Sequence, residues 1–387
     1  MSQNSPIQKP ARATLIVEAS ERDSDLMWIS GFRAGDPFVF AEIGGTSHLL
    51  LTDLELGRGR KESTVDEVHS WSEIAKAASE NRANGDEATP VTYSGVIGHF
   101  LRERQVSALK VPAKFPLRIA DQLRELGFDL ETVADPFYPE RGRKNPDEIA
   151  NLEAAQAATE AAMEFAIDQI RNAEVRGDAL FLDGLALEVP RLKKMVRLFC
   201  LEREMALGEF IIAPGDQGCD PHECGSGPLK AGETIILDIF PRHLTTMAWG
   251  DMSRTVFKGK APKEVRRLHA TVREAQEAAI DAIAPGVTGD EVHSKVQDVF
   301  TREGYSTELK NGEWVGFFHG TGHGLGLDIH EPPRLTKGGP RLEEGMVVTV
   351  EPGLYYPGLG GCRIEDVVVV TADGCRNFNR ASKDLEV

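Results

Sequence analysis

The sequence predicts a two-domain protein in which a small α/β region precedes a larger α+β domain. A chain of 387 residues is long enough to form two hydrophobic cores. After the charged segment Glu140–Lys144, Asn145, Pro146 and two acidic residues form a strong helix start. Beyond it, two pairs of helices alternate with strands that carry acidic residues. We therefore expect a smaller domain over residues 1–143 and a larger one over residues 144–387, with a sheet floor and flanking helices.

The first region alternates between short β-rich runs and helical segments. The strands that we expect are Thr14–Glu18, Phe38–Ile43, His48–Thr52 and Ala108–Val111, and the clearest helix is Pro116–Leu126, which Gly127 ends. The histidines of this region, His48, His69 and His99, are scattered along the sequence. We interpret each of them as a structural or surface residue.

Four helices are predicted in the larger domain: 146–174, Pro190–Leu207, Pro262–Ala284 and Asp290–Glu303. The last of them is opened by Thr288–Glu291, which has the form of a capping box. The two helix pairs resemble each other in sequence, since Ala166–Ile170 and Ala279–Ile283 each precede a Gly-Asp pair. This similarity predicts an internal duplication about a pseudo-two-fold axis.

Composition and charge exclude several classes of function. With 41% hydrophobic and 27% charged residues the chain is typical of a globular protein, and its net charge of −17 argues against a nucleic-acid-binding surface. The five cysteines are odd in number and lack a CxxC pair, which indicates a reducing compartment. Met1–Ala13 is polar, and no run of ~18 apolar residues occurs. We expect a soluble cytoplasmic protein without nucleic-acid or membrane partners.

The stretch Gly316–Glu331 contains three of the ten histidines, His319, His323 and His330. Its alternating glycines each disfavour a helix by ~1 kcal/mol. We therefore predict an open glycine-rich loop that leads into a short strand, Leu325–His330. Because glycines allow a close approach of the backbone, the imidazoles can converge on one point.

Four carboxylates lie in or beside apolar strands that could face these histidines: Asp238, Asp251, Glu351 and Glu365. An unpaired carboxylate in such a strand is costly and needs a cation or a hydrogen-bond network. On the last strand, alternation places Arg363 and Glu365 on one face and Asp366 on the other. We therefore choose Glu365 as the inward group.

One neutral imidazole, His323, and these four carboxylates form an oxygen-rich ligand set. Four carboxylates carry too much charge for one divalent ion and suit two. The set favours Mn²⁺, although Co²⁺, Fe²⁺ or Zn²⁺ can also bind. Two ions ~3.5–4 Å apart can deprotonate a bridging water, and the resulting hydroxide is a nucleophile near neutral pH. The sequence therefore predicts metal-assisted hydrolysis.

A competing zinc site is suggested by Cys219–Cys224, which contains two thiols and His222. A second Cys or His pair at ribbon or finger spacing is missing from the sequence. We therefore expect His222 to point into the site made by the other strands.

Together these motifs resemble the pita-bread metallopeptidases. The resemblance rests on Pro221–Glu223, Gly232–Asp238, Asp251–Thr255, His319–Gly324, Val350–Gly353 and Arg363–Asp366, in that order. The family includes methionine aminopeptidase, aminopeptidase P and prolidase, with creatinase as a relative that uses no metal. The match covers about residues 140–380, and residues 1–143 resemble the N-terminal domain of the aminopeptidase P, prolidase and creatinase branch.

The resemblance implies roles for individual residues. Asp238 would chelate one metal, His323 and Glu351 the other, and Asp251 and Glu365 would bridge both.

The remaining roles implied by the resemblance concern the substrate and the proton. His222 and His330 would contact the substrate carbonyl and stabilise the tetrahedral intermediate, and His319 would line the proline pocket. Glu351 would also relay the proton as acid and base, and Arg363 would orient Asp238. In one departure from the family pattern, residues 241–247 lengthen the turn between the two aspartates, which affects the neighbouring substrate rim.

The implied function is that of a dinuclear Xaa-Pro dipeptidase or Xaa-Pro aminopeptidase that acts on small proline-containing peptides as a homodimer. Two alternatives remain open at this point: a metal-free C–N hydrolase like creatinase, and an inactive peptide-binding module on the same fold. The presence of all five ligand types argues against both. Metal analysis discriminates, because both alternatives imply no stoichiometric metal.

Overall fold

The computed structural model describes residues 11–81 and 91–387, so the first ten residues of the polar N-terminal stretch lie outside the described part. The chain divides into two compact units, Met1–Arg141 and Gly142–Val387. Each unit has hydrophobic cores of its own. In the described part of the chain, the structure contains no helix with the length and apolar character needed to span a membrane.

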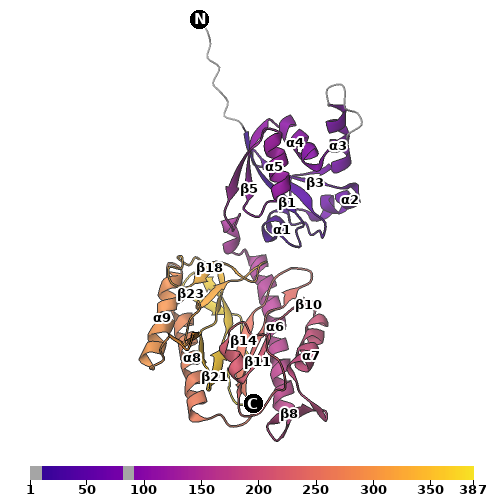
Figure 1. The fold of residues 1–387 in the computed structure, drawn as a ribbon. Coiled ribbons are helices and arrows are strands. Elements are labelled where there is room, and N and C mark those ends of the chain that lie inside the picture. The colour runs from indigo at the N-terminus through magenta and orange to yellow at the C-terminus, as the bar shows by residue number, and fades with distance from the viewer. Residues whose placement is uncertain (1–10, 82–90) are drawn as a thin grey trace. The chain divides into compact units, whose positions relative to one another are not determined.

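The smaller unit is built on a six-stranded mixed sheet of order β4-β3-β2-β1-β5-β6 (Figure 1). Its strands are β1 (Ala11–Glu18), β2 (Phe38–Ile43), β3 (Thr46–Leu51), β4 (Glu67–Ser70), β5 (Val106–Pro112) and β6 (Asp129–Val133). Its helices are α1 (Ser24–Ser30), α2 (Asp53–Glu62), α3 (Trp71–Glu80), α4 (Tyr93–Glu103) and α5 (Leu117–Glu125). The predicted α/β character is confirmed, and the four predicted strands overlap β1, β2, β3 and β5.

Alternation along the strands buries both faces of this sheet. Leu15 of β1 belongs to a core with Phe100 of α4, whereas its neighbour Ile16 belongs to a second core with Leu26 of α1. On β3, Leu50 belongs to the core that contains α4 side chains. Every second residue of β3, counted from Leu50, therefore faces α4.

Two long helices and two shorter ones frame the larger unit: α6 (Pro146–Asn172), α7 (Val189–Leu201), α8 (Lys263–Ala282) and α9 (Gly289–Arg302). Both predicted helix starts are confirmed, because Asn145 and Thr288 each form a capping box with a glutamate three residues later. The predicted extension of α7 to Leu207 is wrong. The helix ends at Leu201, and Glu204 adopts a left-handed φ of 58°, which an α-helix cannot contain.

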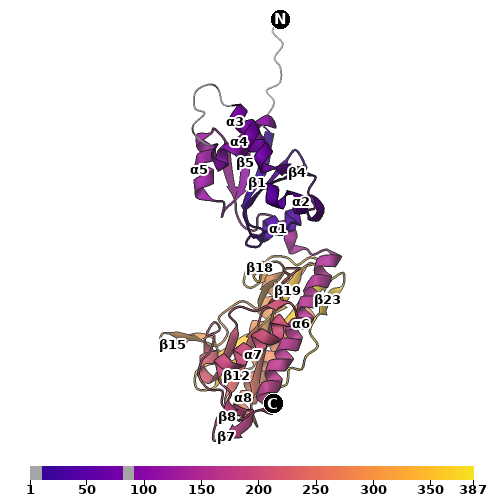
Figure 2. The same ribbon diagram turned by 90° about the vertical axis from the view of Figure 1, so that its right-hand side faces the viewer.

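Two antiparallel sheets form the floor of the larger unit (Figures 1 and 2). The first has the order β11-β12-β14, with bounds Ile211–Pro214, Thr234–Ile239 and Met252–Phe257. The second has the order β18-β17-β19-β22-β23, with bounds Glu331–Leu335, Gly322–Gly324, Val347–Val350, Asp366–Thr371 and Gly374–Asn377. Val347 packs in a core with α6 and α7, and its neighbour Val348 packs in a core with α8 and α9. The second sheet therefore lies between the two helix pairs.

Short strands complete the larger unit. They are β7 (Glu174–Arg176), β8 (Ala179–Leu182), β9 (Leu185–Ala186), β10 (Met205–Ala206), β13 (Arg242–His243), β15 (Glu308–Lys310), β16 (Glu313–Val315), β20 (Gly353–Tyr356) and β21 (Gly360–Arg363).

The strand predicted over Leu325–His330 is wrong. The histidine-rich stretch forms β17 at Gly322–Gly324, then bends, and resumes as β18 at Glu331. A Cβ atom on Gly322 would lie 1.9 Å from the carbonyl oxygen of Thr349, and one on Gly324 would lie 2.3 Å from that of Pro332. The glycines are therefore required because only they let this short strand approach its neighbours so closely.

Candidate metal centre

A cavity of about 810 Å³ in the larger unit is lined by every site residue that the sequence singled out. These residues are His222, Asp238, Asp251, His319, His323, His330, Glu351, Arg363 and Glu365. The structure thus brings together side chains that are separated by as many as 143 residues.

The ends and centres of neighbouring strands position the carboxylates. Asp238 lies on β12 opposite Ser253 of β14, and Asp251 immediately precedes β14. Glu351 directly follows β19 and Glu365 directly precedes β22. All four side chains therefore reach the cavity from adjacent elements of the two sheets.

Asp366 lies on the other side of this strand and does not line the cavity. Its Oδ1 accepts a hydrogen bond from Arg254 Nη2 at 2.9 Å, and its Oδ2 lies 2.7 Å from Lys383 Nζ. Because these cations hold the pKa of Asp366 below its usual range despite burial, it is a structural carboxylate.

His323 lies at the centre of the acidic cluster. Its Nε2 is 3.4 Å from Glu351 Oε1 and 3.6 Å from Asp251 Oδ2, and ligand atoms of His323, Asp251 and Glu365 all lie within 4.8 Å of one another. Its Nδ1 donates a hydrogen bond to the carbonyl oxygen of Gly324 at 3.1 Å, which directs the Nε2 lone pair at the carboxylates. Burial and the neighbouring His330 lower the pKa of His323 to about 3, so the imidazole is neutral.

The cluster carries more negative charge than the protein itself compensates. Burial raises the pKa of Asp251, and the charges of Asp238 and Glu351 raise it further. Burial likewise raises the pKa of Glu351 to about 7 and that of Glu365 well above its usual range. Asp238 Oδ1 is buried and, within the described residues, has no hydrogen-bond partner. An uncompensated, oxygen-rich donor set of this kind fits divalent cations.

Arg363 links two of the carboxylates, Asp238 and Glu365, through hydrogen bonds. Its Nη2 donates a hydrogen bond to Asp238 Oδ2 at 2.6 Å, and its Nε donates to Ser253 Oγ at 3.0 Å. Ser253 Oγ in turn donates to Glu365 Oε2 at 2.9 Å. Arg363 therefore fixes the orientation of Asp238 directly and that of Glu365 through one hydroxyl group.

Tyr355 is a site residue that the sequence analysis missed. Its hydroxyl oxygen accepts a hydrogen bond from Arg363 Nη1 at 3.2 Å and lies 2.8 Å from His319 Nε2, while His319 Nδ1 lies 2.7 Å from the Gly320 carbonyl oxygen. Since a carbonyl can only accept, His319 Nδ1 donates and Tyr355 donates to Nε2. Both nitrogens of His319 are thus occupied, and its ring presents a C–H surface to the cavity beside Phe318.

His222 and His330 lie at the exposed part of the cavity. The His330 ring stands perpendicular to that of His323, with ring centroids 4.3 Å apart. His222 lies on the segment that contains Cys219 and Cys224. Among the described residues, neither of the two side-chain groups with metal-binding geometry includes these cysteines, so the competing zinc interpretation has no geometric support.

The lengthened turn between Asp238 and Asp251 forms its own small sheet. Its strand β13 pairs with β10, and Met247 adopts a left-handed φ of 62° where the chain returns. Trp249 Nε1 then donates a hydrogen bond to the Leu327 carbonyl oxygen at 3.0 Å. The turn thereby contacts the bend that carries His330, while Asp238 stays on β12 and Asp251 directly before β14.

Several buried carboxylates around a neutral imidazole, held on adjacent strands, define a metal-dependent hydrolase. The family model described as metallopeptidase family M24 matches residues 150–372, and the chain belongs to this family. Membership implies divalent metal ions at the cavity, and the predicted enzyme class, a metallopeptidase, is confirmed.

Two relatives that this chain is similar to are named Xaa-Pro dipeptidases. The chain is 34% identical over 249 residues to an Xaa-Pro dipeptidase of Lactobacillus helveticus, which covers 63% of this chain and 61% of that protein. It is 28% identical over 348 residues to an Xaa-Pro dipeptidase of Pyrococcus furiosus, which covers 88% of this chain and 87% of that protein.

Solved structures share the fold over nearly the whole chain. The prolidase from Pyrococcus furiosus matches with a TM-score of 0.76 at 23% identity, covering 96% of both chains. The X-Pro aminopeptidase from Thermotoga maritima matches with a TM-score of 0.79 at 21% identity, covering 97% of this chain and 98% of that chain. The predicted fold, a pita-bread domain preceded by a smaller α/β domain, is confirmed.

Proposed function

We propose that the protein hydrolyses the peptide bond that precedes proline in short peptides, as an Xaa-Pro dipeptidase or Xaa-Pro aminopeptidase. The observation that carries this proposal is the convergence of four carboxylates and the neutral His323 on one buried cavity. The names of the relatives support the substrate class, and they include both dipeptidases and an aminopeptidase.

Five residues would hold two divalent ions: Asp238, Asp251, His323, Glu351 and Glu365. The predominance of oxygen donors favours Mn²⁺, with Co²⁺, Zn²⁺ or Fe²⁺ as alternatives. When bound, such ions activate a water molecule for attack and polarise the substrate carbonyl.

The protein's own side chains would complete the reaction. Glu351, whose pKa burial raises to about 7, is matched to accepting a proton and returning it to the leaving amine near neutral pH. His222 and His330, on the exposed part of the cavity, would donate hydrogen bonds to the carbonyl oxygen as its negative charge develops. The C–H surface of His319 would pack against the proline ring.

We also propose a cytoplasmic homodimer. The cysteine content supports a reducing compartment. Resemblance to the aminopeptidase P and prolidase branch supports the dimer, in which the domain of residues 1–143 would help to build the assembly and limit peptide length.

The deciding assay compares Xaa-Pro dipeptides, Xaa-Pro-Yaa tripeptides and matched Xaa-Ala peptides with the Mn²⁺-loaded full chain. We expect hydrolysis of Xaa-Pro substrates, loss of this hydrolysis in Glu351→Gln, and its retention in Glu277→Gln, which changes an exposed glutamate paired with Arg273 on α8. Metal-loaded protein that leaves every Xaa-Pro peptide intact, or that cleaves only the alanine peptides, would refute the proposal.

A further inference from the structure

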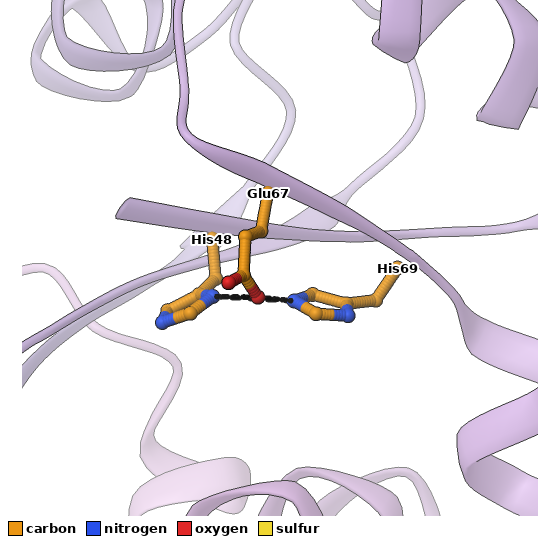
Figure 3. A group of neighbouring side chains, drawn as sticks. All are labelled: His48, Glu67 and His69. Carbon is orange, nitrogen blue, oxygen red and sulfur yellow. Dashed lines mark hydrogen bonds and ion pairs between the residues drawn. The ribbon is translucent and has the colours of Figure 1, made fainter. Parts of the chain in front are cut away.

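A second cluster of metal-ligand side chains lies in the smaller unit, far along the sequence from the M24 residues. It consists of His48 on β3 and of Glu67 and His69 on β4 (Figure 3). The two strands run parallel, with His48 beside Glu67 and Leu50 beside His69. Since β4 ends the sheet, the cluster lies at a sheet edge. His48 and His69, which are scattered along the sequence, therefore lie side by side in the structure, whereas His99 lies beside Glu103 of its own helix.

Three atoms of this cluster form a nearly equilateral triangle. His48 Nδ1 lies 3.2 Å from His69 Nε2 and 3.3 Å from Glu67 Oε2, and His69 Nε2 lies 3.2 Å from the same Glu67 oxygen. A tetrahedral zinc ion with bonds of ~2.0–2.1 Å separates its ligand atoms by about 3.3–3.4 Å. The spacing of the three atoms thus matches one face of such a tetrahedron.

Hydrogen bonds alone explain this arrangement less well than a bound metal ion does. A neutral imidazole has one N–H group. If both rings donated to Glu67 Oε2, the two nitrogens would still approach to 3.2 Å without a hydrogen bond between them. A divalent ion would instead receive a lone pair from each of the three atoms.

We propose that His48 Nδ1, His69 Nε2 and Glu67 Oε2 bind one zinc ion, with water as the fourth ligand. Two imidazoles and one carboxylate suit zinc, whereas Mg²⁺ and Ca²⁺ require oxygen ligands. The ion would join the edge strand β4 to β3. Its fourth position would be open to exchange, because the side chains of His69 and Glu67 are 22% and 51% exposed.

The surroundings hold the two rings in place for this role. The ring of Phe100 on α4 packs edge-on against His48 and His69, with centroid distances of 5.6 and 5.0 Å. Nearby charges are Arg104, Asp66 and Glu67, whose sum is negative and favours a cation.

Zinc content measured on the full chain tests the site. Wild type, His69→Ala, Glu67→Gln and His99→Ala are dialysed to equilibrium against the same buffered free Zn²⁺, and the bound zinc is determined by atomic emission. Because the M24 cavity would also take up zinc, the difference in zinc content between the variants is the readout. We expect His69→Ala to bind one equivalent less than wild type, Glu67→Gln to weaken this equivalent at least ~10-fold, and His99→Ala to match wild type.

Cobalt provides a second readout. With Co²⁺ in place of zinc, we expect the visible absorption of a four-coordinate site to fall in His69→Ala and Glu67→Gln but not in His99→Ala. Circular dichroism checks the fold, and Glu67→Gln, which changes an exposed side chain, carries the test if His69→Ala does not fold. Equal zinc content in wild type and Glu67→Gln across a series of buffered free Zn²⁺ concentrations, or a loss in His99→Ala equal to that in His69→Ala, overturns the proposal.

Discussion

Glu351→Gln should have opposite effects on stability without and with metal. In the metal-free chain the substitution removes one charge from a buried cluster of like charges. Burial and the charge of Asp238 raise the pKa of Glu351 from 4.5 to about 7, although Arg363 opposes this rise. The ionised form is therefore less favourable in the folded chain than in the unfolded one by about 3 kcal/mol.

The sign of the pH dependence follows from this rise. A group with a raised pKa in the folded state contributes stability that is present below about pH 4.5 and is lost as the pH increases through 7. Wild-type protein in a chelator should therefore lose about 3 kcal/mol over this interval because of Glu351. Glu351→Gln should not lose this contribution, and at pH 8 it should be the more stable protein.

Saturating metal should reverse the order. Wild type gains about 4.1 kcal/mol when the free ion is at about 1,000 times its dissociation constant, which exceeds the ~3 kcal/mol by which the variant leads at pH 8 without metal. The variant lacks a ligand and should lose most of this gain. Unfolding in urea at pH 5 and pH 8, with a chelator or with Mn²⁺, measures the free energy of unfolding of both proteins under all four conditions.

Glu277→Gln is the matched control, because Glu277 is about half exposed and pairs with Arg273 one turn away on α8. It should leave both the pH dependence and the metal response unchanged. If Glu351→Gln is less stable than wild type at pH 8 in the chelator, the carboxylates do not repel one another as argued, and the electrostatic case for the metal centre fails.

Further outcomes follow from the same site. Metal titration should saturate at two divalent ions per chain in the M24 cavity, and saturation at one would exclude a dinuclear centre. His323→Ala should lose metal, whereas His330→Ala and His222→Ala should retain it and lower kcat; the reverse pattern would exchange their roles. Arg363→Lys should weaken metal binding about 10–100-fold through misorientation of Asp238, as measured by competition with a chelator. Light scattering should show a dimer of the full chain at micromolar concentration, and a monomer would contradict the proposed assembly.

The carboxylates that line the cavity could be predicted because each breaks a local rule. Asp238 stands in a wholly buried strand, where a carboxylate is costly without a partner. Glu351 and Glu365 likewise adjoin runs of buried valines, and strand alternation distinguishes Glu365 from Asp366. The helix starts were predictable because the residues of a capping box contact one another within four positions of the sequence.

Contacts that depend on strand pairing were beyond prediction from one sequence. Tyr355 joins His319 to Arg363 because β20 pairs with β21, which ends at Arg363, and because Tyr355 forms a bridge with Gly316 at the start of the histidine-rich stretch. His48 and His69 are 21 residues apart and meet only through the parallel register of β3 and β4. No local periodicity encodes such a register, because a shift of one residue would turn either ring to the opposite face of the sheet.

The lengthened turn over residues 241–247, in which the sequence departs from the family pattern, has a structural role. The lengthened turn before Asp251 could have displaced this aspartate, yet the Gly250 amide donates to the Pro241 carbonyl oxygen at 2.9 Å and closes the turn at its base. The extra residues instead extend outward as β13 and return through Trp249, whose main-chain and indole N–H groups donate to the carbonyl oxygens of Gly326 and Leu327. The insertion therefore supports the bend that presents His330, so we expect variation in this turn to alter the proposed substrate contacts while β12 and the start of β14 keep Asp238 and Asp251 in place.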